Sequence, residues 1–208
     1  EISLGLVGSE MCIRDRKGGD YMKYVLETFD IMKRYKHSIV LEKLNMHVPI
    51  GSIYGLIGRN GAGKTTLIRL LCGLQQLTSG EYKIYGIKNT DRKICEVRKR
   101  IGAIIETPSI CMDMTAKDNL KEQYKIVGLP NYDGIYDLLK LVGLEKTGKK
   151  TVKHFSLGMK QRLGIAIALV GSPDILILDE PINGLDPEGI IEIRELILKL
   201  NKEKGITF

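Results

Sequence analysis

The run Gly58–Thr65 constrains the fold of this chain more than any other stretch, because it fits the pattern G-x-x-x-x-G-K-[ST] at every fixed position. In this pattern the glycines let the backbone curl, so that successive amide groups point at the phosphates of a nucleoside triphosphate. The apolar run 53–57 predicts a strand before the loop, and the stretch 66–72 predicts a helix after it. A helix N-terminus adds partial positive charge to an anion site. The sequence therefore predicts a phosphate-binding loop between a strand and a helix.

The side chains of this loop have separate expected roles. Lys64 should reach the β- and γ-phosphates, and the hydroxyl of Thr65 should ligate Mg²⁺. The residues expected to contact the nucleotide are Gly58, Asn60, Gly61, Ala62, Gly63, Lys64, Thr65 and Thr66. The alternative is a glycine-rich turn that happens to carry a lysine, and the flanking strand and helix disfavour it.

A second constellation consists of four apolar residues, 175–178, followed by the carboxylates Asp179 and Glu180. In a phosphate-loop protein such a strand is central, and its carboxyl end opens beside the loop. Asp179 would hold Mg²⁺, directly or through water, and Glu180 would orient and polarise the attacking water. In the alternative interpretation the two acids only cap a buried strand.

Composition narrows the class of protein. The chain has 208 residues and a formal net charge of +7, but its basic residues are scattered, with small clusters at 98–100 and 149–150, and carry no interleaved aromatics. This distribution favours a solvated surface over a nucleic-acid groove, so we expect no nucleic-acid partner. No apolar run approaches the roughly 20 residues that a membrane-spanning helix needs. The four cysteines lack the C-x-x-C spacing of a zinc site, and a reducing cytoplasmic setting is expected.

The chain divides into an N-terminal extension and one domain. Residues 1–21 are expected to be a non-native or disordered extension, because the stretch 8–16 resembles translated sequencing-adaptor sequence; a genuine disordered extension is the alternative. Within the domain, 22–208, two β-prone stretches at 24–31 and 39–48 flank a polar turn. Thr115 is expected to cap a helix. Further strands are expected at 81–85 and 101–106, and helices at 116–127, 132–142, 158–170 and 187–200.

Two further motifs carry a family resemblance. Residues 155–162, F-S-L-G-M-K-Q-R, resemble the signature motif of ABC ATPases, usually written L-S-G-G-Q, and residues 181–187 resemble the D-loop of that family. The phosphate loop and the strand with its two carboxylates occur in the same chain, in the order that the family shows. Over 22–207 the chain therefore resembles an ABC ATP-binding subunit. The resemblance implies an α/β, P-loop NTPase (RecA-like) core. It also implies an N-terminal antiparallel β-subdomain and an inserted α-helical subdomain at about 109–165.

The resemblance also implies a composite ATP site. Two ATPase subunits would pair head to tail, and Ser156 and Gly158 of one subunit would face the γ-phosphate that the other holds. Asp186 would help to connect the two sites across the interface. Tyr35 matches the aromatic residue that stacks on adenine in this family, and a surface tyrosine in a turn is the alternative.

One position departs from the family pattern. The family usually has glutamine where this chain has Glu106, at the end of the strand before the helical subdomain. A carboxylate there still accepts hydrogen bonds from water or ligates Mg²⁺, but it adds negative charge beside the phosphates. With the downstream run at 155–164, this pattern resembles the subgroup that exports bacitracin and lantibiotic-type peptides.

The family's switch histidine is expected after the strand that follows the helix 187–200, so His154 does not match its position. The chain is therefore expected to end before that residue. The resulting prediction is the ATPase subunit of an ABC transporter, acting at the cytoplasmic face of the membrane with a separate transmembrane permease subunit. The alternatives are a soluble ABC-type ATPase that works on ribosomes or DNA, and a nucleotide-binding fragment with little hydrolysis.

Overall fold

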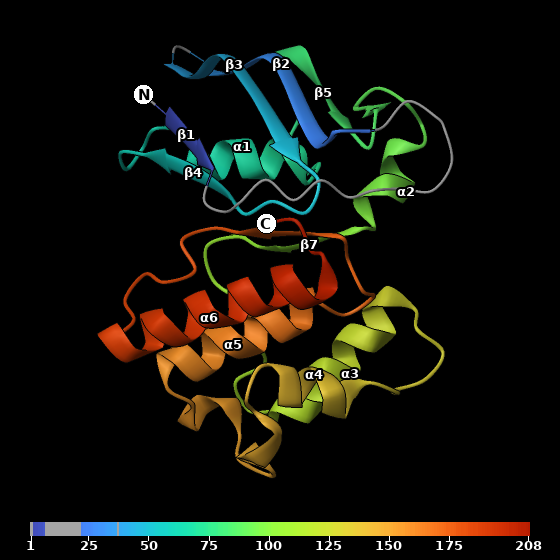
Figure 1. Cartoon of the computed structure of the whole chain (residues 1–208), viewed down its shortest axis with the longest axis vertical. Helices are drawn as coiled ribbons and strands as arrows, with labels where there is room; N and C mark the ends of the chain where they lie inside the picture. The colour runs from blue at the N-terminus through green and yellow to red at the C-terminus, as the bar shows by residue number, and fades with distance from the viewer. Residues whose placement is uncertain (1, 7–21, 37) are drawn as a thin grey trace. The chain divides into compact units, whose positions relative to one another are not determined.

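The computed structural model describes residues 2–6, 22–36 and 38–208 (Figure 1). Most of the predicted extension 1–21 lies outside these residues, and so does His37 in the predicted polar turn. The described chain forms two compact units. One contains the residues up to Ile101 together with Gly205–Phe208, and the other contains Gly102–Lys204.

The first unit is built on a four-stranded sheet of order β3-β2-β5-β6, in which every neighbouring pair is antiparallel. Its strands are β2 (Tyr24–Tyr35), β3 (Ser38–Pro49), β5 (Ser79–Ile84) and β6 (Ile87–Lys88). Val25 and Ile31 of β2 are fully buried, as expected for β-branched residues on the inner face of a sheet. The sheet confirms the predicted antiparallel β-subdomain.

The phosphate-loop segment of the first unit joins β4 (Tyr54–Gly58) to α1 (Lys64–Leu71). Strand β1 (Ile2–Leu6) pairs antiparallel with β4, and the amide of Tyr54 donates a 2.8 Å hydrogen bond to the carbonyl oxygen of Phe208. The strand, loop and helix follow in the predicted order. A short helix, α2 (Ile94–Arg98), was not predicted.

The second unit contains helices and a two-stranded sheet of β7 (Ile101–Ile104) and β8 (Ile175–Leu178). Figure 1 shows α5 and α6 side by side, and α5 also contacts α3 and α4. The helices are α3 (Ala116–Val127), α4 (Ile135–Leu141), α5 (Leu157–Ala168) and α6 (Pro187–Lys204), with 3₁₀ turns η1 (Glu145–Thr147) and η2 (Val152–His154).

Helix α5 forms the centre of this unit. Leu163 and Ile165 on it are fully buried, and each such side chain contributes about 1.5–3 kcal/mol through burial. Strand β7 approaches the end of α5 closely, because a Cβ on Gly102 would lie 2.2 Å from the carbonyl oxygen of Ala168. The oxygen of the Thr115 side chain accepts a 3.1 Å hydrogen bond from the amide of Asp118, which confirms the predicted cap of α3.

Candidate functional site

Two glycines shape the phosphate loop of the first unit. Gly61 and Gly63 have φ values of 82° and 93°, in the left-handed region that glycine adopts without a steric penalty. A Cβ on Gly63 would also lie 2.8 Å from Cδ2 of Leu41 and 2.9 Å from the carbonyl oxygen of Val40. Gly63 is therefore required both by its torsion angle and by the close approach of the loop to β3.

Helix α1 starts directly at this loop. The amide of Leu67 donates a 2.9 Å hydrogen bond to the carbonyl oxygen of Gly63, and the first turn of α1 contains no acidic residue. The Nζ of Lys64 donates to the carbonyl oxygens of Gly58 at 2.8 Å and Arg59 at 3.2 Å. The ammonium group and the positive end of the helix macrodipole thus lie at one loop, an arrangement suited to phosphate.

Tyr35 lies in the same unit, at the end of β2, with its side chain 41% exposed. Its hydroxyl donates a hydrogen bond to Oε1 of Gln75, and Nζ of Lys33 lies 4.9 Å from the centroid of its ring. These contacts hold an accessible aromatic ring at the surface. Its predicted stacking on adenine stays a prediction.

The carboxylates of the second unit lie at paired strand ends. The amide of Asp179, directly after β8, donates a 2.9 Å hydrogen bond to the carbonyl oxygen of Ile104, the last residue of β7. Because this bond joins the carboxyl ends of both strands, the two strands run parallel. Asp179 is 5% exposed. Glu106 follows the end of β7 by two residues, and Glu180 follows the end of β8 by two residues.

Both glutamates adopt a backbone conformation that is rare for their residue type. Glu106 has φ 64° and Glu180 has φ 48°. Such residues cost about 1–3 kcal/mol each, and they cluster at active sites and ligand clamps. The sheet edge that carries Asp179 therefore also carries two glutamates with strained backbone torsions.

Glu180 has a local partner that the sequence did not single out. Nδ2 of Asn183 donates a 3.2 Å hydrogen bond to Oε2 of Glu180, and the amide of Asn183 donates a 3.1 Å bond to the carbonyl oxygen of Glu180. The three-residue separation in the turn after the strand is the only sequence signal for this pair. Asn183 orients the carboxylate that is predicted to polarise water.

The predicted signature residues lie at the start of α5. Oγ of Ser156 accepts a 3.2 Å hydrogen bond from the amide of Met159, so Ser156 is the N-cap of this helix. A Cβ on Gly158 would lie 3.9 Å from Cδ2 of Leu185, and one on Gly184 would lie 3.2 Å from Cδ2 of Leu157. The signature turn and the predicted D-loop therefore contact each other within one chain.

Asp186 starts the last helix. Its Oδ1 accepts a 3.0 Å hydrogen bond from the amide of Gly189, in the first turn of α6. A Cβ on Gly189 would lie 2.8 Å from the same oxygen. Asp186 therefore caps α6 in addition to the role that the family resemblance implies.

The predicted residues divide between the two units. Tyr35 and the loop 58–66 belong to the first unit. The second unit contains Glu106, Ser156, Gly158, Asp179, Glu180 and Asp186.

The donor atoms of Thr65, Glu106 and Asp179 fit Mg²⁺, which prefers oxygen ligands. Among the described residues, no group of three or more His, Cys, Asp or Glu side chains is placed to hold a metal ion.

Comparison with known proteins decides the family. Residues 41–183 match the family described as ABC transporter. The chain belongs to the ABC transporter family. Over 186 residues, 89% of this ABC chain, it is 49% identical to the bacitracin transport ATP-binding protein BcrA of Bacillus licheniformis, and it spans 60% of that protein's length. It is also 45% identical to the lantibiotic transport ATP-binding protein SrtF of Streptococcus pyogenes. That similarity extends over 183 residues, which make up 88% of this chain and 77% of the relative.

A solved structure shares the fold of this ABC chain. It is the dimeric post-hydrolysis state of the ATP-binding cassette MJ0796 bound to ADP and phosphate, with a TM-score of 0.74 and 26% identity. The similarity covers 88% of this chain and 85% of the other. The α/β fold with a phosphate loop is thereby confirmed.

Proposed function

We propose that this chain is the ATP-binding subunit of an ABC exporter, which couples ATP hydrolysis to the movement of a peptide antibiotic through a separate membrane subunit. One observation carries the proposal. The loop that ends at Lys64 curls into the N-terminus of α1 through left-handed glycines, in a chain 49% identical to a bacitracin transport protein. The place of action would be the cytoplasmic face of the membrane.

Each predicted residue has a role in hydrolysis that its chemistry supports. Lys64 and the loop amides bind the β- and γ-phosphates, and Thr65, Asp179 and Glu106 supply oxygen ligands for Mg²⁺. Bound Mg²⁺ supplies positive charge that offsets the charge of the phosphates. Glu180, oriented by Asn183, accepts a hydrogen bond from the attacking water and polarises it.

A second copy of the ATPase subunit would complete the site. The N-terminus of α5, which Ser156 caps, has no acidic residue in its first turn and so suits a γ-phosphate held by the partner. Gly158 allows close approach there, and Asp186 would connect the two sites. The dimer of MJ0796 with ADP and phosphate supports this arrangement.

The second unit offers a surface for the membrane subunit. Ile126, Tyr132 and Tyr136, on and between α3 and α4, are 77%, 44% and 65% exposed. A hollow of about 450 Å³ in the same unit is lined by Tyr124, Pro130 and Leu138, among others. Exposed aromatic side chains are enriched at protein interfaces. No helix among the described residues is long and apolar enough to cross a membrane. We assign the docking of the membrane subunit to this surface of the helical subdomain at about 109–165.

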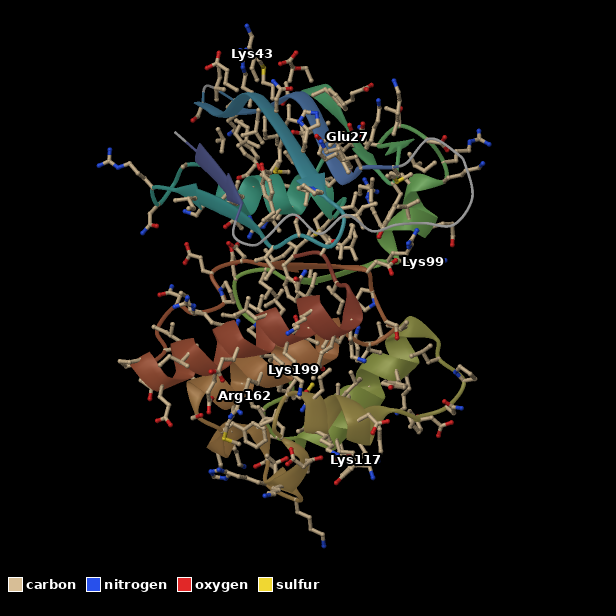
Figure 2. All side chains as sticks on the ribbon, in the orientation of Figure 1. Glu27, Lys43, Lys99, Lys117, Arg162 and Lys199 are labelled. Carbon is tan, nitrogen blue, oxygen red and sulfur yellow. The ribbon has the colours of Figure 1, made fainter. Side chains whose placement is uncertain are left out.

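Calorimetric titration with ATP and Mg²⁺ tests the proposal. We expect the chain to bind ATP and Lys64→Ala to abolish binding, while Lys199→Ala on the exposed face of α6 (labelled in Figure 2) binds as the parent does. Equal affinity of the Lys64→Ala variant would refute the nucleotide site. Binding without turnover would favour the nucleotide-binding fragment instead.

A separate experiment tests the transport role. Co-expression with a membrane protein encoded beside this gene should give a complex, and Tyr136→Ala should weaken it while ATP affinity is unchanged. Co-purification with ribosomes or DNA in place of a membrane protein would favour the soluble alternative.

A further inference from the structure

Residues 144–155 form a turn-rich segment that buries its apolar side chains and exposes its lysines. Leu144, Val152 and Phe155 are 1%, 0% and 5% exposed. The turn is stabilised by a 2.7 Å hydrogen bond from the hydroxyl of Thr147 to the carbonyl oxygen of Leu144. The exposed lysines of the segment are Lys146, Lys149, Lys150 and Lys153. The fold thus anchors this segment and exposes four lysines to solvent.

A second segment lies directly against it and adds exposed methionines. The amide of Lys153 donates a 2.8 Å hydrogen bond to the carbonyl oxygen of Met112, and the amide of Val152 donates a 2.9 Å bond to that of Met114. Thr115 and Thr151 form an antiparallel bridge beside them. Met112 and Met114 are 42% and 37% exposed. Lys117 follows on the first turn of α3, where Figure 2 labels it.

The carboxylates of these two segments do not neutralise the lysines. The stretches 111–121 and 144–155 contain six lysines and three carboxylates, a higher ratio of basic to acidic residues than in the whole chain, which has 32 basic and 25 acidic residues. Oδ1 of Asp113 forms an ion pair with Nζ of Lys153 at 3.4 Å. Asp118 forms an ion pair with Lys121 and accepts a hydrogen bond from the hydroxyl of Thr115. The third carboxylate belongs to Glu145. Lys146, Lys149 and Lys150 form no ion pair with any described residue.

We propose that this lysine face, made of Lys117, Lys146, Lys149, Lys150 and Lys153 with Met112 and Met114, binds the anionic lipid headgroups of a membrane surface. Clusters of four to eight basic residues recognise anionic lipids through the negative potential of the leaflet. Lysine stems are flexible and carry point charges, which suits mobile headgroups. The two methionines are apolar side chains that can enter the headgroup boundary between the charges.

The composition disfavours the two other classes of anionic partner. Protein interfaces are depleted in lysine and enriched in arginine and aromatic residues. The stretches 111–121 and 144–155 contain no arginine, tyrosine or tryptophan, and Phe155 is buried. The same lack of accessible aromatic rings removes the stacking platform of a single-stranded nucleic-acid site.

Vesicle sedimentation with the whole chain tests the proposal. The chain should bind vesicles of equal parts phosphatidylserine and phosphatidylcholine, release them at high salt, and leave pure phosphatidylcholine vesicles unbound. A variant with Lys146→Gln, Lys149→Gln and Lys150→Gln should bind the mixed vesicles more weakly by about fivefold for each lysine removed.

The control variant carries Lys43→Gln, Lys93→Gln and Lys199→Gln, three exposed lysines outside the lysine face, so that it has the same net charge. It should bind the mixed vesicles as the parent chain does. Equal binding of the two triple variants, absence of binding by the parent, or equal binding to pure phosphatidylcholine would each overturn the proposal. ATP binding, measured separately on the same samples, reports on the nucleotide site and is expected to be unchanged in both variants.

Discussion

Asp179 and Ile104 join the carboxyl ends of two strands through a 2.9 Å hydrogen bond from the amide of Asp179 to the carbonyl oxygen of Ile104. Glu106 follows Ile104 by two residues and Glu180 follows Asp179 directly. This backbone hydrogen bond therefore places the residues that carry three carboxylates at one edge of the β7–β8 sheet.

Replacement of Glu180 by glutamine should separate ATP binding from ATP hydrolysis. The amide keeps the size of the side chain and the contact with Asn183, but it is a poor acceptor for the proton of the attacking water. We expect turnover to fall by about a hundredfold or more, with ATP affinity little changed. Phosphate release and ATP titration measure the two quantities. Glu195→Gln, at an exposed position of α6, should hydrolyse ATP normally; equal loss in both variants would argue against the role of Glu180.

Replacement of Glu106 by glutamine restores the residue that the family usually has. The change removes one negative charge from the proposed surroundings of the phosphates, so ATP should bind about three- to tenfold more tightly. It also removes a possible Mg²⁺ ligand, so turnover should need a higher Mg²⁺ concentration. Titration of ATP at several Mg²⁺ concentrations measures both effects. Weaker ATP binding at saturating Mg²⁺ would contradict the electrostatic argument.

Sequence patterns predicted the elements whose signals are local. The helix 116–127 and the strand 175–178 have the predicted bounds, because a threonine cap starts the helix and an apolar run defines the strand. Helix α2 was missed, since five residues are too few to show a helical period. Strand β2 runs four residues beyond its predicted end at Ile31, into the polar stretch that pairs with β3.

Contacts between distant residues had no sequence signal. The hydrogen bond of Tyr35 with Gln75 spans 40 residues, and the bridge between Thr115 and Thr151 spans a comparable length of chain. Such pairs arise from tertiary packing, which local propensity does not report. The chemistry of the phosphate loop was predicted because its spacing alone dictates it, whereas the orientation of Glu180 by Asn183 required the structure.

Tyr82 connects the C-terminus of α1 to the rest of the first unit. Its hydroxyl donates a 3.0 Å hydrogen bond to the carbonyl oxygen of Leu70 and accepts one from Arg98, whose Nε is buried with no hydrogen-bond partner among the residues that the structure describes. Tyr82→Phe should destabilise the protein by about 1–3 kcal/mol, because it removes the hydrogen bond of the Tyr82 hydroxyl to Leu70 and leaves the half-buried guanidinium of Arg98 with fewer partners. Tyr136→Phe, at a side chain 65% exposed, should change stability by at most about 0.5 kcal/mol. Urea denaturation compares the two, and similar losses would contradict the assignment.

Alanine at the two left-handed glycines of the phosphate loop separates torsional strain from steric clash. The Cβ of Gly61→Ala would meet no atom within 4 Å. This variant should therefore lose only the stability that an alanine in the left-handed conformation costs, about 1–2 kcal/mol. Gly63→Ala carries the same strain, and its Cβ also meets the carbonyl oxygen of Val40 at 2.9 Å. We expect a further loss of about 1–3 kcal/mol from this overpacking, measured by urea denaturation. Since the clash pushes the loop away from β3, Gly63→Ala should also weaken ATP binding more than Gly61→Ala does. Equal losses of stability in the two variants would show that β3 does not fix the loop, and that the torsion of Gly63 alone accounts for its requirement.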